Sequence, residues 1–160
     1  MIARLVRSAD FERVLRSRSR ASSAHFAVHH VPDRPGTTAK PQAGTNPSEL
    51  STGETRRVSS PVDDFGASPV RAAPDGVWLG AVVPKRHARR AVTRTLLKRQ
   101  IRAAVSGSEV SLAAGLWVVR LRAPFDRQKF VSAASDALKR AARLELLHLL
   151  ASASQRIAVR

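Results

Sequence analysis

The sequence predicts an α/β two-layer sandwich, with one small mixed sheet and flanking helices. Three short apolar segments of strand type, at 24–31, 77–83 and 116–122, alternate with three helical patterns. Elements that alternate in this way pack helices against a sheet around one core. The predicted order is α-β-loop-β-α-β-α, within a single domain that spans residues 1–160.

Ser8 is expected to cap the first predicted helix, because serine is favoured at the position before a helix begins. The acidic residues at positions 10 and 12 fall in its first turn, where the helix dipole favours anions. Its apolar stripe consists of Phe11, Val14 and Leu15. The strand that follows, AHFAVHHV at 24–31, alternates so that Phe26 and Val28 share one face.

Residues 32–76 differ from the rest of the chain. They hold 7 of the 9 prolines and 5 of the 8 glycines, and they show neither helical nor strand periodicity. With so few large apolar side chains, the segment cannot bury enough surface to offset the entropy of ordering. We predict a disordered insertion at 32–76, tolerated at the surface because long loops cost little to close.

The segment VWLGAVV at 77–83 is typical of a buried strand, which Pro84 closes. A helix is predicted from 88 to about 105, ended by Ser106-Gly107. If the strands on either side of this helix are parallel, the connection between them is a crossover. The general rule for such a crossover is a right-handed turn.

The third strand, at 116–122, precedes a long helix that Asp126 is expected to cap. The helix shows a mostly apolar stripe at helical spacing, made of Phe130, Ala134, Ala137, Leu138, Ala141, Leu144 and Glu145. This stripe predicts that the final helix packs on the sheet.

Composition excludes several classes of protein. The chain has 28 Lys and Arg against 12 Asp and Glu, a net charge of +16, which indicates a polyanionic partner. It has no cysteine, which excludes disulfides, thiolate metal sites and a cysteine nucleophile. No apolar run approaches the ~18 residues of a membrane span, and the N-terminus shows no signal-peptide core. We expect a cytoplasmic protein without a membrane partner.

The strongest functional signal is the run PKRHARRAVTRTLLKRQIRAAV at 84–105. Eight of the 18 residues from 85 to 102 are Lys or Arg and none is acidic, whereas a merely solvated helix face interleaves both signs. On a helical projection, a sector of roughly 140° holds the basic ridge, defined as Arg94, Lys98, Arg99 and Arg102. Arginine suits phosphate because its planar fork bonds two oxygens at once. The pattern predicts an RNA-binding surface.

The five histidines raise the question of a metal or catalytic site. His25 and His29 are predicted to share one face of a strand, but two histidines without a placed carboxylate are a weak zinc signal. The folded part holds no paired carboxylates, no glycine-rich phosphate loop and no Ser-His-Asp set. The sequence therefore predicts neither a metal site nor a catalytic residue in the protein.

Three groups of residues carry a resemblance to a known family. The first is VPKR at 83–86, RRA at 89–91 and RTLLKRQIR at 94–102. The others are Arg4-Leu5 with Asp10-Phe11 and Val14, and Arg122-Ala123-Pro124 before the final helix. Together they resemble the protein subunit of bacterial ribonuclease P, over about residues 4–31 and 77–150. Where the family has Arg-Asn-Arg, this sequence has Arg94-Thr95-Leu96, so Thr95 replaces the asparagine and Leu96 the second arginine.

The resemblance implies an unusual left-handed β-α-β crossover, against the general rule. It also implies a protein that binds ribonuclease P RNA and the 5′ leader of precursor tRNA, while the RNA hydrolyses the phosphodiester with Mg²⁺ that the RNA itself mainly holds. The expected RNA-binding residues are Lys85, Arg86, Arg89, Arg90, Arg94, Thr95, Lys98, Arg99 and Arg102. The leader cleft, between the first helix and the sheet, would be lined by Phe11, Leu15 and His29.

Two other functions fit the same residues. A non-catalytic RNA-binding protein of the ribosome or its assembly would carry the same basic helix and would follow ribosomal particles. A nuclease in its own right would need carboxylates or histidines of the protein and would cleave without any RNA partner.

Overall fold

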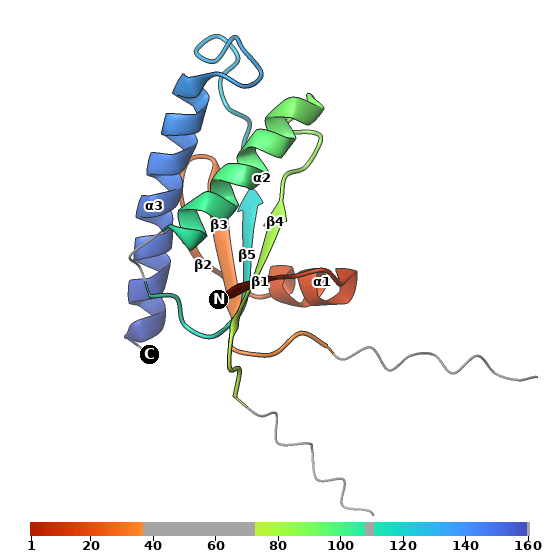
Figure 1. The fold of residues 1–160 in the computed structure, drawn as a ribbon, viewed down its shortest axis with the longest axis vertical. Coiled ribbons are helices and arrows are strands. Elements are labelled where there is room, and N and C mark those ends of the chain that lie inside the picture. Colours follow the sequence, from red (N-terminus) through yellow and green to blue (C-terminus); the bar gives the residue numbers. More distant parts are fainter. Residues whose placement is uncertain (37–72, 108–110, 160) are drawn as a thin grey trace, which may run out of the picture. The chain divides into compact units, whose positions relative to one another are not determined.

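The computed structural model describes residues 1–36, 73–107 and 111–159. In chain order, its elements are β1 (Ile2–Arg4), α1 (Ser8–Arg16), β2 (Ser19–Ser22), β3 (Phe26–Val31), β4 (Val77–Val82), α2 (Ala91–Ser106), β5 (Gly115–Leu121) and α3 (Asp136–Ala158). The predicted mixed α/β class is confirmed (Figure 1).

The five strands form one mixed sheet in the order β1-β4-β5-β3-β2. Strand β4 lies parallel to β1 and β5, whereas β3 is antiparallel to β5 and β2. Helix α2 connects the adjacent parallel strands β4 and β5. In Figure 1 both strands run upward, α2 lies in front of them and β5 is to the left of β4. This is a left-handed crossover, so the general right-handed rule fails here.

Alternation along β5 assigns the two faces of the sheet. Trp117 and Val119 join the large core with α2 and α3, whereas Leu116 and Val118 belong to a smaller cluster with α1. Successive strand residues point to opposite faces, so α1 packs on the face opposite α2 and α3. The sandwich of the sheet with α2 and α3 is thus the main layer pair, and α1 partly covers the other face.

Helices α2 and α3 bury stripes of small and branched apolar side chains. In α2 the buried residues are Leu96, Leu97, Ile101, Ala104 and Val105. In α3 they are Leu138, Ala142, Leu146, Leu149, Leu150 and Ala153. Both stripes follow the i, i+3, i+4 spacing of one helix face. They fix α2 on the sheet, with its remaining surface toward solvent.

Two strands were missed by the sequence analysis, and two helix starts were predicted wrongly. Strands β1 and β2 are short edge strands with too few residues for a readable period. Ser8 is the first residue of α1, and Arg7 occupies the cap position without a capping side-chain bond. Helix α2 begins at Ala91, because 85–87 form a turn in which Ala88 N–H bonds to the Pro84 carbonyl at 3.1 Å.

The start of the last helix was also predicted wrongly. Asp126 closes a turn, where its carboxylate accepts from Gln128 N–H at 2.8 Å. The cap of α3 is Ser135, whose hydroxyl accepts from Leu138 N–H at 3.2 Å. The predicted stripe is therefore wrong in part: Leu144 is 63% exposed. The alanines at 134, 137 and 141 gave an apolar period without the volume that decides which face is buried.

Glu145 of α3 ties this helix to the turn between β2 and β3. Its carboxylate accepts from His25 N–H at 2.7 Å, from the His25 ring Nδ1 at 2.7 Å and from the Ser23 hydroxyl. Burial alone would raise the pKa of Glu145, but these bonds from Ser23 and His25 outweigh it and hold the pKa below its usual value. The carboxylate stays charged and keeps all three donors satisfied.

His30 and Gly115 meet at the start of β5. The His30 ring donates from Nε2 to the Ala114 carbonyl at 3.1 Å. Burial is the main cause that lowers the pKa of His30. The bond to Ala114 raises this pKa, whereas the charge of Arg20 lowers it further. Gly115 has φ of 132°. A Cβ there would lie 2.5 Å from the Val31 carbonyl oxygen. Only glycine fits this junction.

The described ends of the predicted insertion are held near α1. Arg13 donates to the Asp33 carboxylate at 3.0 Å and to the Arg34 carbonyl at 2.7 Å, while Gly36 N–H bonds to Asp10 at 3.0 Å. Arg34 also joins the two ends, through an ion pair with Asp75 at 3.2 Å. Residues 37–72 lie outside the described part, so their predicted disorder stays a prediction.

Removing Glu145 should destabilise the fold in a pH-dependent way. We expect Glu145→Ala to lower the free energy of unfolding by about 1–3 kcal/mol at neutral pH, because His25 N–H loses its acceptor. The folded pKa lies below 4.5, so the charge contributes fully above pH 4.5 and its contribution is lost as pH falls through the folded value. Urea unfolding of wild type and Glu145→Gln from pH 7 to pH 3 measures this. Identical acid limbs for the two proteins would contradict it.

Deleting residues 37–72, with a short Gly-Ser linker in their place, should leave the fold nearly unchanged. Arg34 already holds the two ends together, and loop closure depends only weakly on length, so we expect a change below ~1 kcal/mol. Thermal unfolding of the shortened chain checks this, with Arg34→Ala as the variant that loosens the same ends. A large loss of stability would show that this segment belongs to the fold.

Candidate nucleic-acid interface

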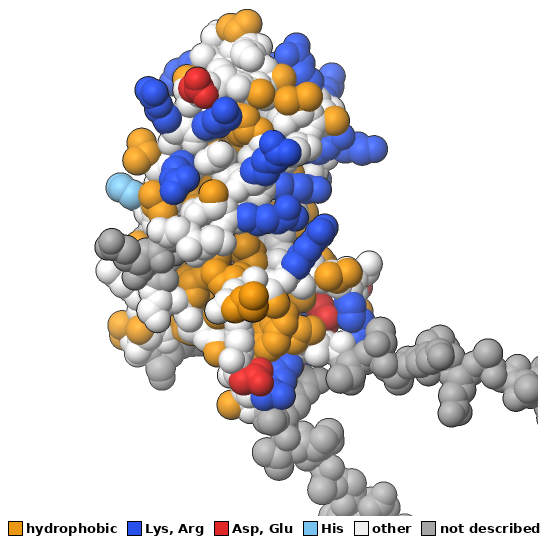
Figure 2. All heavy atoms as spheres, in the orientation of Figure 1, with side chains coloured by type: hydrophobic (Ala, Val, Ile, Leu, Met, Phe, Trp, Pro, Cys, Tyr) orange, Lys and Arg blue, Asp and Glu red, His pale blue; other side chains and the backbone are white. Residues whose placement is uncertain are grey.

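The basic ridge lies on the solvent side of α2. Arg99 and Arg102 are exposed, while Arg94 and Lys98 are half-buried. Figure 2 shows Lys and Arg side chains gathered in a band over α2. Within the described residues, none of the four forms an ion pair with a carboxylate. The like charges on this surface are therefore left for an external polyanion to neutralise.

Arg94 also has a structural role that the sequence did not predict. Its guanidinium donates to the carbonyls of Ala88 at 3.0 Å and Arg89 at 2.7 Å. These bonds hold the loop before α2 in an extended path, with Arg90 at φ −77° and ψ 131°. Lys85, Arg86, Arg89 and Arg90 are exposed on this loop, beside the ridge.

The departure from the family's Arg-Asn-Arg has a structural reason here. Thr95 is exposed, but Leu96 is buried against the core at 6% exposure. An arginine at this position would carry its charge into the packing between helix and sheet, which is costly without a partner. Leu96 strengthens the anchorage of α2, and the ridge retains its four cations.

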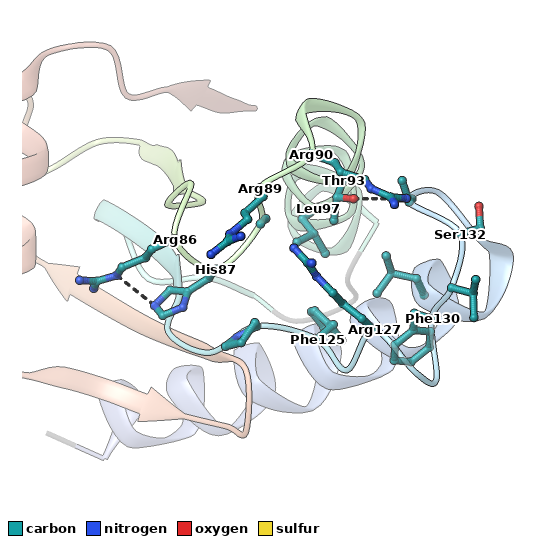
Figure 3. A pocket seen from close by; sticks show the side chains of 15 residues that line it. Arg86, His87, Arg89, Arg90, Thr93, Leu97, Phe125, Arg127, Phe130 and Ser132 are labelled. Atoms are coloured by element: carbon teal, nitrogen blue, oxygen red, sulfur yellow. Dashed lines mark hydrogen bonds between the residues drawn. The ribbon is translucent and has the colours of Figure 1, made fainter.

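A cavity of about 580 Å³ opens between the loop before α2 and the segment 124–133. Its charged lining comprises Arg86, Arg89, Arg90 and Arg127, and its aromatic lining comprises Phe125 and Phe130. We call it the Arg127 pocket (Figure 3). Sequence analysis missed Phe125 and Arg127 as site residues, because it placed 126–135 in a helix and read Phe130 only as part of that helix's stripe. The one available signal was Arg127 itself, three residues after the proline that follows the third predicted strand.

The residues predicted for the leader cleft gather around α1 and its sheet face. Phe11 and Leu15 are half-buried in the cluster that includes Leu116 and Val118. The ring of Phe11 lies on Gly80 of β4 so closely that a Cβ there would overlap it. Trp78, half-buried on the same face, is an aromatic candidate that the sequence analysis did not single out.

His29 is held more tightly than a freely stacking side chain. It is 8% exposed, and its ring donates from Nδ1 to the Ser17 carbonyl at 2.9 Å. This bond ties β3 to the C-terminal end of α1. His29 therefore shapes the wall of the predicted cleft, while Phe11 and Leu15 supply its apolar surface.

The histidines do not combine into a metal site in the described residues. His25 precedes β3 and faces Glu145 on α3, whereas His29 turns toward α1, so their predicted shared face is wrong. Among the residues that the structure describes, no group of three His, Asp or Glu side chains could hold a metal ion. Nor does any helix within the described ranges have the length and hydropathy to cross a membrane.

Comparisons with known proteins agree with this geometry. The ribonuclease P family model matches residues 2–145. The ribonuclease P protein component of Bordetella parapertussis is 36% identical over 144 residues, covering 90% of this chain and 85% of that protein. That of Burkholderia pseudomallei is 39% identical over 82 residues, covering 51% and 60%. The structure of the Staphylococcus aureus RNase P protein superposes with a TM-score of 0.51 at 20% identity, covering 92% and 91%.

The family match, the identity over most of the chain and the shared fold support one conclusion. The chain belongs to the ribonuclease P protein family, whose members are protein subunits of a tRNA-processing ribonucleoprotein endoribonuclease.

Proposed function

We propose that this subunit binds ribonuclease P RNA through the basic ridge and the loop 85–90, and that it binds the 5′ leader of precursor tRNA along the α1 face. The observation that carries the proposal is the uncompensated ridge on α2. Each phosphate that these cations neutralise releases counterions and relieves repulsion between RNA strands.

The chemistry of cleavage is assigned to the RNA partner, with Mg²⁺ that the RNA mainly holds. The described residues offer no triad of metal-ligating side chains. What the chain offers is affinity and position: cations for phosphates on α2, and apolar and aromatic groups for unpaired bases on the α1 face. We place this assembly in the cytoplasm.

A reconstitution experiment tests the proposal. Purified protein is mixed with ribonuclease P RNA from the same organism and a precursor tRNA, at a Mg²⁺ concentration too low for the RNA alone. We expect release of the 5′ leader only when both partners are present. Cleavage by the protein alone would instead make it a nuclease, and no effect of the protein would favour a general ribosomal RNA-binding role.

Charge reversal on the ridge should abolish RNA binding without unfolding the protein. Arg99 and Arg102 are exposed, so Arg99→Glu with Arg102→Glu leaves the core intact. We expect an affinity loss of about 100-fold or more, from two lost charge-assisted contacts and added repulsion. The matched control is Arg140→Glu with Arg143→Glu on α3, which changes the net charge equally. Equal losses for both pairs in a filter-binding assay would show that only net charge matters.

Crowding the Phe11 ring should weaken the contact with the leader and leave the contact with the rest of the tRNA unchanged. Gly80→Ala places a methyl group against the ring, and Phe11→Leu removes the ring while keeping an apolar side chain. For both we expect about tenfold weaker holoenzyme binding of precursor tRNA and unchanged binding of mature tRNA, since one stacked base is lost. Gly76→Ala is the control, because its Cβ would make ordinary contact with Trp78 at 3.5 Å. Normal leader affinity in both variants would remove Phe11 from the cleft.

A further inference from the structure

The Arg127 pocket is not accounted for by the ridge or by the α1 face. It lies on the α2 side of the sheet, since Leu97 and Phe125 in its lining belong to the core shared with α2 and α3. Seven of its 15 lining residues come from the segment 124–133, between β5 and α3, and five come from the loop 85–90. It is therefore continuous with the loop 85–90 and on the sheet face opposite the proposed leader cleft.

We propose that the Arg127 pocket holds a single unpaired nucleotide of ribonuclease P RNA, with its phosphate between Arg89 and Arg127 and its base against Phe130. This inference rests on the proposed function, because it names a point of contact with the same RNA. The leader is not the expected occupant, since the proposed leader site lies across the sheet.

The charges of the pocket favour a phosphate. Its lining includes four arginines and no acidic residue. Figure 3 shows Arg89 and Arg127 extending from opposite walls toward the same gap, while Arg86 turns away and donates from Nε to the His87 ring at 3.1 Å. Arginine forks that converge from two segments match the several oxygens of one phosphate. Among the described residues, no carboxylate forms an ion pair with these arginines.

The start of α2 adds to this preference. Thr93 in its first turn and Arg90 at its cap position both line the pocket. No acidic residue stands in the first turn, and no side chain caps it. The first N–H groups of a helix carry partial positive charge, so an anion near them is stabilised.

The size and the apolar part of the lining favour a nucleotide over a small anion. About 580 Å³ falls within the range of small-molecule sites, roughly 300–1,000 Å³. Phe130 is half-buried, and its ring meets the Phe125 ring edge-to-face, with centroids 5.8 Å apart and an interplanar angle of 80°. Phe130 also packs against the main core, and the exposed part of its ring lines the pocket, where a base can stack on it. A paired base could not enter such a cavity, so the nucleotide must be unpaired.

The walls of the pocket are held in place without a ligand. The Thr93 hydroxyl donates to the Ala133 carbonyl at 2.8 Å and joins the two walls. The Phe125 ring is stacked on His25 at 4.0 Å with an interplanar angle of 8°, and His25 is itself bound to Glu145. A preformed site loses less conformational entropy on binding.

The first test uses mononucleotides and the full chain. NMR titrations compare AMP, inorganic phosphate and adenosine, observing the Arg127 side chain, Thr93 and Phe130. We expect AMP to bind about tenfold tighter than phosphate, because a stacked base adds to the charge contact, and adenosine to bind weakly. Phe130→Leu should reduce AMP binding to the level of phosphate. Equal binding of AMP and phosphate, or no shifts in the pocket, would overturn the nucleotide assignment.

The second test uses the RNA. We expect Arg127→Ala to weaken binding of ribonuclease P RNA about tenfold and to reduce the slope of log affinity against log salt by about 0.7, the value for one phosphate of a single strand. Lys129→Ala is the matched control, because Lys129 is also exposed, two residues away, and outside the pocket lining. Equal effects of the two variants would overturn the inference.

A crosslink identifies the occupant. A photoreactive residue in place of Val131, which is exposed at the pocket, should label one unpaired position of ribonuclease P RNA in the holoenzyme. A crosslink to precursor tRNA instead, or labelling spread over many positions, would overturn the assignment. If wild-type protein fails to bind ribonuclease P RNA at all, the proposed function fails, whereas the AMP titration still reports on the pocket by itself.

Discussion

The apolar contact between α2 and the sheet is the interaction on which the rest of the structure depends. Leu97, Ile101 and Ala104 are fully buried and anchor α2 on the sheet. The exposed side of α2 carries the basic ridge, in which no cation forms an ion pair with a carboxylate of the described part of the chain. Such a surface repels itself in the absence of RNA. Burial of the opposite stripe opposes this repulsion and fixes the cations in the geometry of one helix. Leu96, in place of the family's arginine, enlarges that buried stripe.

The left-handed crossover decides where the charged groups are presented. Because α2 crosses over β4 and β5 in a left-handed connection, the start of α2 lies beside the segment 124–133 that follows β5. Arg94 then fastens the loop 88–90 by two bonds to backbone carbonyls, and the Thr93 hydroxyl joins α2 to Ala133. The backbone before α2 is thus held by side chains that belong to the basic ridge or lie beside it. The loop and the ridge form one continuous basic surface.

The two faces of the sheet are suited to different tasks. The face under α1 carries a small cluster in which Phe11 lies on Gly80 and Trp78 is half-exposed, which suits contact with unpaired bases. The other face carries the main core beneath α2 and α3, and the basic ridge lies on the solvent side of α2. Glu145 and His25 join α3 to the β2–β3 turn and also support the Phe125 ring. Stability and the shape of the Arg127 pocket are therefore coupled.

The sequence by itself determined the fold class, the strands β3, β4 and β5, the helix α2 and its basic ridge. These features are local: alternation, helical spacing and the absence of acidic residues are properties of contiguous residues. Only the tertiary structure decided the pairing of β1 with β4 and of β2 with β3, and the start of α3 at Asp136. It also decided the opposite directions of His25 and His29 and the convergence of Arg89 with Arg127. Each of these depends on contacts between residues distant in the chain, where packing volume and hydrogen-bond partners outweigh local propensity.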